Sequence, residues 1–142
     1  MSGRAGLSRD EWSTLQFAPF WMLAGVVGAY RGFDILEYEA FSRSVELAAS
    51  APGRLNRELM TSVATDLERV AGEFAADPRS IGCGLCEVAT ILNNVPTEEA
   101  ELLKSALVSA IGEGVARARG RFGRVMSEQD ADNLELVAQF LS

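Results

Sequence analysis

The chain has 142 residues, of which 48% are hydrophobic and 23% are charged, and its formal net charge is −7. This length suits one sizeable core, so we expect a single domain over residues 8–142 after a flexible segment at 1–7. The acidic balance argues against nucleic acid and anionic lipid as partners, because both bind clustered cations. Histidine is absent, which excludes Ser-His-Asp and Cys-His catalysis and histidine-ligated zinc.

A capping pattern predicts a helix near the start of the chain. Ser8 and Glu11 have the spacing of a capping box, so we expect a helix from Arg9 toward Ala18. Pro19 is then expected to interrupt or restart this helix, because proline lacks the N–H group that a helix interior uses.

The most apolar part of the chain follows. Residues 20–30 leave no polar face, which is typical of a helix surrounded by others. The uncharged stretch 17–30 is shorter than the roughly twenty residues that cross a bilayer, so we expect a core helix and no transmembrane segment. Without a signal-peptide pattern or a disulfide framework, we expect a cytoplasmic location. A cap at Asp34, with Glu37 three positions later, predicts a helix to about Ser50.

Three further helices are predicted by apolar residues that recur every three or four positions. The most regular series predicts one long helix and consists of Leu55, Leu59, Val63, Leu67, Val70 and Phe74. Another helix is expected from Ile81 to Leu92, after a turn at 77–80. Thr97 is the expected cap of the third, which runs to about Gly120 with acids in its first turn and arginines near its end, as the helix dipole favours.

The last predicted helix begins at Ser127 with Asp130 and ends near Leu141. Because no useful run alternates between apolar and polar residues, the predicted fold class is all-α: a compact bundle of about seven helices. Residues 33–41 and 126–134 share one pattern. In each segment an apolar residue comes directly before the cap, an acid lies three positions after the cap, and a second apolar residue lies four positions after that acid. This repetition predicts two loosely related halves.

The acids at these two helix starts are the candidate metal ligands: Asp34, Glu37, Glu39, Glu128 and Asp130. Carboxylate oxygens suit Ca²⁺ or Mg²⁺, so divalent-metal binding is one hypothesis. Neither segment has the EF-hand arrangement of acids at loop positions one, three and five with glycine at six. Because capping alone explains the spacing, we expect no cofactor, with Ca²⁺ or Mg²⁺ as the alternative.

A basic cluster forms a candidate partner-binding surface: Arg117, Arg119, Arg121 and Arg124. Guanidinium groups suit a phosphate or an acidic protein. The alternative is a solvated helix end that complements the dipole.

Cys83 and Cys86 form a C-x-x-C motif. A redox pair of the thioredoxin type belongs in a βαβ setting, and tetrahedral zinc needs about four ligands. The favoured interpretation is therefore structural, two small apolar residues one helical turn apart, since cysteine is often buried. A zinc ion shared by two chains is the alternative.

Three segments together carry a family resemblance: Trp12 to Pro19, Gly32-Phe33-Asp34-x-x-Glu37, and Gly123-Arg124-Val125-Met126-Ser127-x-x-Asp130 leading to Leu141. With these the chain resembles the TerB-like family, small acidic all-α domains with two related halves that are associated with tellurite resistance and bacterial stress responses. The resemblance implies this fold and a non-catalytic role. Family members often carry Asp-Gly before the cap, a feature linked with divalent-metal binding, whereas here Arg31 and Phe122 precede the glycines.

The expected function is a non-catalytic interaction or scaffold module of a bacterial stress-response system, with a protein partner. A divalent-metal-binding domain that uses the acidic helix starts is the first alternative. A carboxylate- or thiol-dependent enzyme is the second, and without histidine or a catalytic constellation we expect no enzyme.

Overall fold

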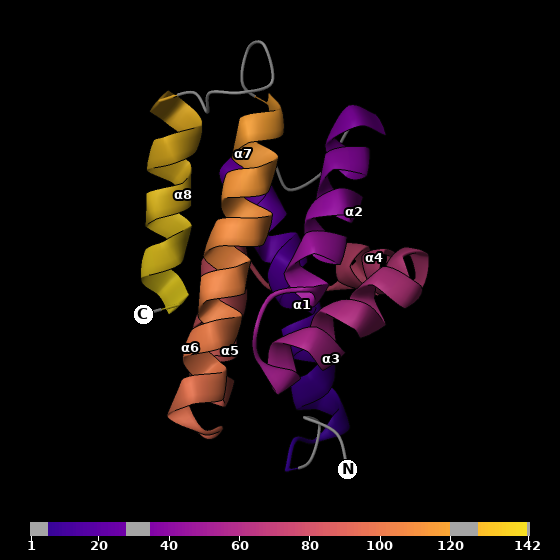
Figure 1. Cartoon of the computed structure of the whole chain (residues 1–142), viewed down its shortest axis with the longest axis vertical. Coiled ribbons are helices and arrows are strands. Elements are labelled where there is room, and N and C mark those ends of the chain that lie inside the picture. Colours follow the sequence, from indigo (N-terminus) through magenta and orange to yellow (C-terminus); the bar gives the residue numbers. More distant parts are fainter. Residues whose placement is uncertain (1–5, 28–34, 120–127, 142) are drawn as a thin grey trace.

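The structure is a computed structural model that describes residues 6–27, 35–119 and 128–141 (Figure 1). Its elements are α1 (Arg9–Val27), α2 (Ile35–Ala49), α3 (Arg54–Thr65), α4 (Leu67–Ala76), α5 (Ile81–Leu92), α6 (Thr97–Ala106), the π-helical η1 (Leu107–Glu113), α7 (Gly114–Arg119) and α8 (Glu128–Leu141). Because α6, η1 and α7 follow one another without a break, they form one long helix. These ranges therefore hold seven helices and no strand, which confirms the predicted all-α bundle.

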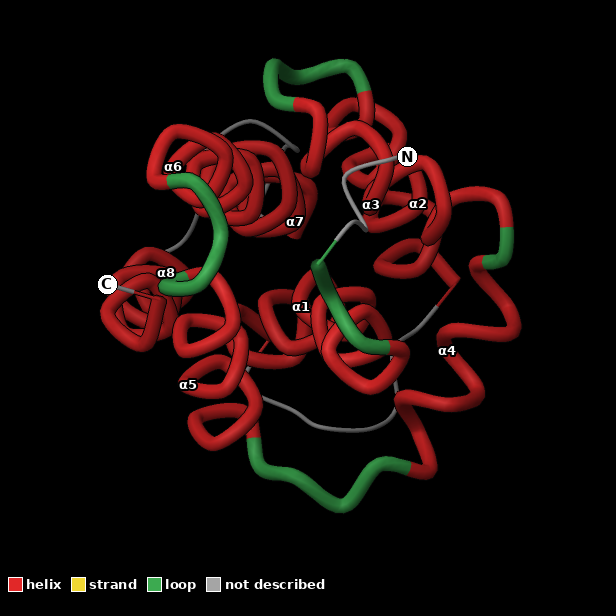
Figure 2. Tube along the Cα trace, turned by 90° about the horizontal axis from the view of Figure 1, so that it is seen from below, coloured by secondary structure: helices red, strands yellow, loops and turns green. Residues whose placement is uncertain are grey.

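Helix α1 lies at the centre of the bundle, and Figure 2 shows the other helices arranged around it. It packs against α5, α8, η1 and α4. Its most deeply buried side chains include Leu15, Trp21, Met22 and Leu23, none of which is more than 1% exposed. For residues 20–27 this confirms the prediction that the apolar stretch is surrounded by other helices, whereas residues 28–30 lie outside the described ranges. Within the described ranges, no helix combines the length and the apolar composition that crossing a bilayer requires.

The start of α1 has the predicted capping box. The Ser8 N–H donates to Glu11 Oε1 at 2.9 Å, and the Glu11 N–H donates to Ser8 Oγ at 3.1 Å. The expected interruption at Pro19 is wrong, because α1 continues through this residue to Val27. A proline inside a helix costs roughly 3 kcal/mol, and burial of the large side chains on both sides of it offsets that cost.

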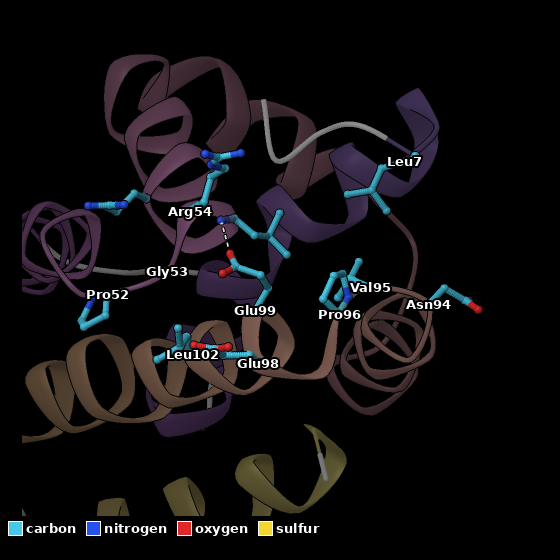
Figure 3. Close-up of a pocket in the computed structure, with 13 residues that line it drawn as sticks. Leu7, Pro52, Gly53, Arg54, Asn94, Val95, Pro96, Glu98, Glu99 and Leu102 are labelled. Carbon is cyan, nitrogen blue, oxygen red and sulfur yellow. Dashed lines mark hydrogen bonds between the residues drawn. The ribbon is translucent and has the colours of Figure 1, made fainter. Parts of the chain in front are cut away.

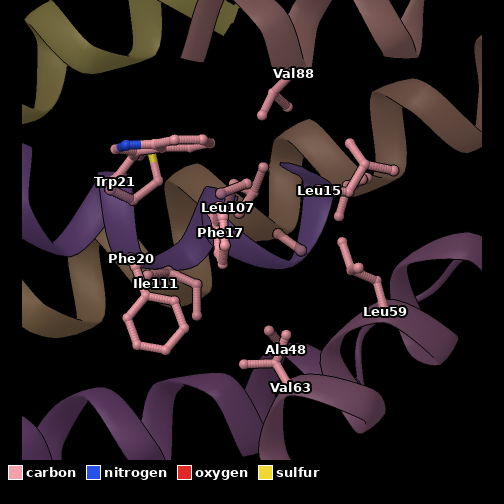
Figure 4. Packing of buried hydrophobic residues seen from close by; sticks show 14 of the residues in the cluster. Leu15, Phe17, Phe20, Trp21, Ala48, Leu59, Val63, Val88, Leu107 and Ile111 are labelled. Atoms are coloured by element: carbon pink, nitrogen blue, oxygen red, sulfur yellow. The ribbon is translucent and has the colours of Figure 1, made fainter. Parts of the chain in front are cut away.

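Aromatic packing attaches α4 to α1. The Phe74 ring on α4 lies 5.8 Å from Phe17, 5.2 Å from Phe20 and 5.9 Å from Trp21, measured between ring centroids. Figure 4 shows these three α1 side chains directed into the shared apolar cluster. Each such pair adds about 0.5–1.5 kcal/mol beyond the burial of its area. These aromatic residues therefore anchor α4 to α1 within the core.

The single helix predicted over residues 55–74 is wrong, because two helices meet there. The backbone leaves the helical region at Asp66, where φ is −116° and ψ is 38°. Just before it, the Thr65 hydroxyl donates to the Thr61 carbonyl at 2.8 Å. Both α3 and α4 keep the helical spacing and both face the core, so the apolar series continues across the break. Leu67, at the centre of that series, is consequently the first residue of α4 and only partly buried.

The long helix formed by α6, η1 and α7 differs from the prediction at its start. Thr97 is its first helical residue and not its cap, because the Ala100 N–H already donates to the Pro96 carbonyl at 3.0 Å. Its middle turn, η1, is π-helical, which the sequence did not indicate. Two glycines let the chain approach its neighbours at this level: a Cβ on Gly112 would overlap Leu134 of α8, and one on Gly114 would lie 2.6 Å from the Ser44 hydroxyl of α2.

Helices α2 and α8 begin at Ile35 and Glu128, next to the residues predicted as their caps. Those caps, Asp34 and Ser127, lie outside the described residues, so the two related halves stay a prediction. The expected flexible segment 1–7 is described only at its last two residues, of which Leu7 packs against the core.

Candidate functional site

The predicted metal ligands are only partly described. Glu39 on α2 and Glu128 on α8 are exposed. Asp34, and the side chains of Glu37 and Asp130, lie outside the described residues. Among the side chains that the structure does describe, no three His, Cys, Asp or Glu residues come together in a way that could hold a metal ion. Metal binding at the acidic helix starts therefore stays a prediction.

The predicted arginine cluster is described at one side chain. Arg117 is exposed on α7 and lies 3.9 Å from the Glu113 carboxylate, one turn earlier. Arg121, Arg124 and the side chain of Arg119 lie outside the described residues, so the cluster also stays a prediction.

The structure brings together a polar cluster around Arg79 that the sequence did not indicate. The Arg79 guanidinium donates to Asp77 Oδ2 at 2.8 Å, to Thr14 Oγ1 at 3.1 Å and to Glu87 Oε2 at 3.2 Å. It also lies 5.0 Å from the ring centroid of Trp21. The hydrogen bond from Arg79 lowers the pKa of the Asp77 carboxyl, and the same bond raises the pKa of Arg79. These contacts connect the turn before α5 to α1, so the cluster has a structural role.

A groove of about 730 Å³ opens at the end of the bundle where residue 6 lies (Figure 3). Its walls are the start of α3, the turn between α5 and α6, and the first turns of α6. Leu7, Val95 and Leu102 give it apolar surface, whereas Arg54 and Arg57 supply positive charge from the α3 side. The groove therefore offers apolar and cationic groups side by side, with the carboxylates of Glu98 and Glu99 on the α6 side.

The two helices of the groove are joined by a carboxylate. Gly53 precedes α3 and has no side chain that could cap it. Instead, Glu99 on α6 accepts the N–H of Leu55 at 2.8 Å, and Figure 3 shows this bond across the groove. The close approach depends on glycine, because Gly53 has a φ of +109° and a Cβ there would lie 3.0 Å from Leu102 Cβ. The start of α3 and the first turns of α6 are therefore joined directly at this part of the groove.

The start of α3 carries the wrong charge for a helix. Acids are favoured in the first turn because the dipole places partial positive charge there, but this first turn contains none and begins with Arg54. Arg57 follows one turn later, and both side chains are exposed. Within the described part of the chain, neither guanidinium has a hydrogen-bond or ion-pair partner. The two arginines are thus available to an acidic group in the groove.

The interpretation of the two cysteines as buried structural residues is wrong. Cys83 and Cys86 are free and both exposed on α5. The apolar side of α5 carries Leu85 and Val88, which are fully buried, and this leaves the thiols on the opposite side of the helix.

No family model matches the chain, and neither do curated proteins or solved structures. The resemblance to TerB-like domains therefore stays a prediction.

Proposed function

We propose that this domain is a non-catalytic interaction module, and that its groove binds a short segment of a partner protein. The segment would carry an apolar side chain next to an aspartate or glutamate. The TerB-like resemblance supplies the proposed setting, a bacterial stress-response system.

The observation that carries this proposal is the pair of unpaired arginines at the start of α3. Cations in the first helical turn oppose the dipole, which costs about 0.3–1 kcal/mol for each charge near the terminus. Arg54 and Arg57 form no contact within the described chain that offsets this cost. Residues that break a local rule without a compensating contact are expected at functional positions. An acidic ligand would supply the missing partner.

The shape and chemistry of the groove restrict what binds there. A volume of about 730 Å³ accommodates a few side chains and not a whole domain. Val95 and Leu102 favour an aliphatic side chain, because burying apolar surface is favourable. Glu98 is exposed on the opposite wall and repels a second acid there. A bound carboxylate is therefore directed toward α3, which fixes the orientation of the segment.

Peptide selection tests the proposal. Short random peptides displayed on phage are selected on the immobilised full-length protein, and the enriched peptides are synthesised with a fluorescent label for anisotropy measurements. We expect them to combine an acid with an aliphatic residue. Arg54→Glu with Arg57→Glu should weaken their binding by about tenfold or more, because two exposed ion pairs of up to about 1 kcal/mol each are lost and a loss of about 1.4 kcal/mol corresponds to a factor of ten.

Arg43→Glu is the matched control, since Arg43 is also exposed but lies on α2, outside the groove. It should leave the affinity unchanged, and far-ultraviolet circular dichroism should be the same for all variants. The proposal is wrong if no peptide is selected, if the selected peptides lack acids, or if the double variant binds them as the wild type does.

A further inference from the structure

Two thiols lie one turn apart on the exposed side of α5. Cys83 and Cys86 are both free and solvent-exposed. The main chain of Cys83 is fixed by the helix cap, because its N–H donates to Ser80 Oγ at 3.2 Å. Side chains three positions apart on a helix are neighbours, with Cβ atoms about 5–6 Å apart. The two thiols therefore form a dithiol on a rigid frame.

This spacing suits a metal ion better than an internal disulfide. A disulfide requires Cβ atoms about 3.5–4.5 Å apart, so closing one would distort the helix. Zinc–thiolate bonds are about 2.3 Å long, which places two sulfur atoms about 3.8 Å apart at the tetrahedral angle. Side chains that converge from the helical spacing reach that separation without a change in the backbone. Each thiol gives up its proton to solvent when it becomes a ligand.

One chain supplies only half of such a site. A structural zinc ion takes four ligands, and histidine is absent from the sequence. The nearest carboxylate in sequence, that of Glu87, is already bound to the Arg79 guanidinium at 3.2 Å. We propose that the missing ligands are Cys83 and Cys86 of a second copy, so that four thiolates hold one zinc ion on the two-fold axis of a homodimer.

The surface beside the dithiol fits a second copy. Among the described residues, Leu136 and Phe140 of α8 are two of the three large apolar side chains that remain exposed, at 57% and 36%. The Phe140 ring lies against the first turn of α5, since a Cβ on Gly82 would be 3.1 Å from Phe140 Cζ. Gly82 precedes Cys83 directly, so apolar surface and thiols adjoin. A two-fold dimer at this position would cover both the apolar side chains of α8 and the thiols. Zinc binding by one chain would leave the apolar side chains exposed.

Zinc titration of the reduced full-length protein tests the proposal. Bound zinc is measured by atomic absorption after gel filtration, and molar mass is measured by light scattering. We expect one zinc ion per two chains and a doubling of the mass. Cobalt(II) in place of zinc should give the intense visible absorption of a tetrahedral tetrathiolate site. A chelator should restore the mass of one chain without loss of helicity, because the exposed thiols are not part of the core.

Two variants separate the explanations. Cys83→Ser with Cys86→Ser should abolish zinc binding and dimer formation together, with an unchanged circular dichroism spectrum. Glu87→Gln should bind zinc as the wild type does, whereas a carboxylate ligand within one chain would make it lose affinity. The proposal is overturned by the absence of zinc binding, by one zinc ion per chain without a change in mass, or by a dimer that persists in the double cysteine variant.

Discussion

Replacing Arg79 by methionine should remove the main polar link between α1 and the turn before α5. The variant loses the bonds from the guanidinium to Asp77, Thr14 and Glu87 and its contact with the Trp21 ring. Arg79 is 24% exposed and Asp77 is 13% exposed, so an aspartate with little access to water loses its cationic partner and keeps only the backbone N–H of residue 79. Methionine retains the apolar part of the side chain. The ion pair with Glu87 contributes little to stability, because that side chain is half-exposed. We therefore expect the free energy of unfolding to fall by about 2–4 kcal/mol.

Urea denaturation of the wild type, Arg79→Met and Arg69→Met at neutral pH measures this loss. Arg69 is the matched control, because it also pairs with two acids but is 49% exposed, and its pairs should be worth less than about 1 kcal/mol. If Arg79→Met loses no more stability than Arg69→Met, the reasoning is refuted.

The same pair of proteins should differ in pH dependence. Arg79 lowers the pKa of Asp77 below its ordinary value of 3.8. The carboxylate therefore stabilises the wild type fully above that value, and this contribution is lost as the pH falls through the lowered pKa. Arg79→Met keeps the backbone hydrogen bond from residue 79 to Asp77 but lacks the larger contribution of the guanidinium, so the difference between the two stabilities should shrink on acidification. A difference that stays constant down to the acid transition would contradict this assignment.

Three further predictions concern single contacts. Glu99→Ala should lower the free energy of unfolding by about 0.5–2 kcal/mol in urea denaturation, because the N–H of Leu55 loses its acceptor; an unchanged value would rule out the cap. Gly84→Ala should cost about 1–3 kcal/mol, because the new Cβ overlaps the Trp21 indole, and a thermal melt identical to that of the wild type would count against it. Asp34→Asn should change the melting temperature little, since asparagine caps about as well as aspartate, and millimolar Ca²⁺ or Mg²⁺ should not raise that of the wild type. If these ions raise the melting temperature of the wild type but not that of Asp34→Asn, the result would instead show a metal site.

The spacing of apolar residues predicted where helices exist but not where they are interrupted. Asp66 divides α3 from α4 without disturbing the apolar series, because both helices face the same core. Pro19 shows the reverse case, in which a strong local signal is overridden by the packing around α1. The π-helical turn at 107–113 lies where α2 and α8 approach from distant parts of the chain. Local pattern carries no information about such long-range contacts.

The candidate sites were predictable to different degrees. The exposure of Cys83 could have been inferred, because the apolar positions of α5 lie on the other side of the helix. Arg54 in the first turn of α3 was also visible as a charge that opposes the dipole. The bond between Glu99 and Leu55 joins residues 44 positions apart, so only the fold reveals it. The groove whose two helices it joins was for that reason missed.

The central position of α1 has a consequence for biosynthesis. This helix leaves the ribosome before all the helices that cover it, and Asn133 of α8, which donates to the Val26 carbonyl at 3.1 Å, follows its partner by 107 residues. Val137, which packs against Gly25, emerges later still. The most apolar segment of the nascent chain, with Trp21 at its middle, therefore stays incompletely covered until α8 has emerged, and exposed apolar surface of this kind is what recruits chaperones or causes aggregation. A chain released before α8 is made would lack the part of the cover of α1 that α8 supplies.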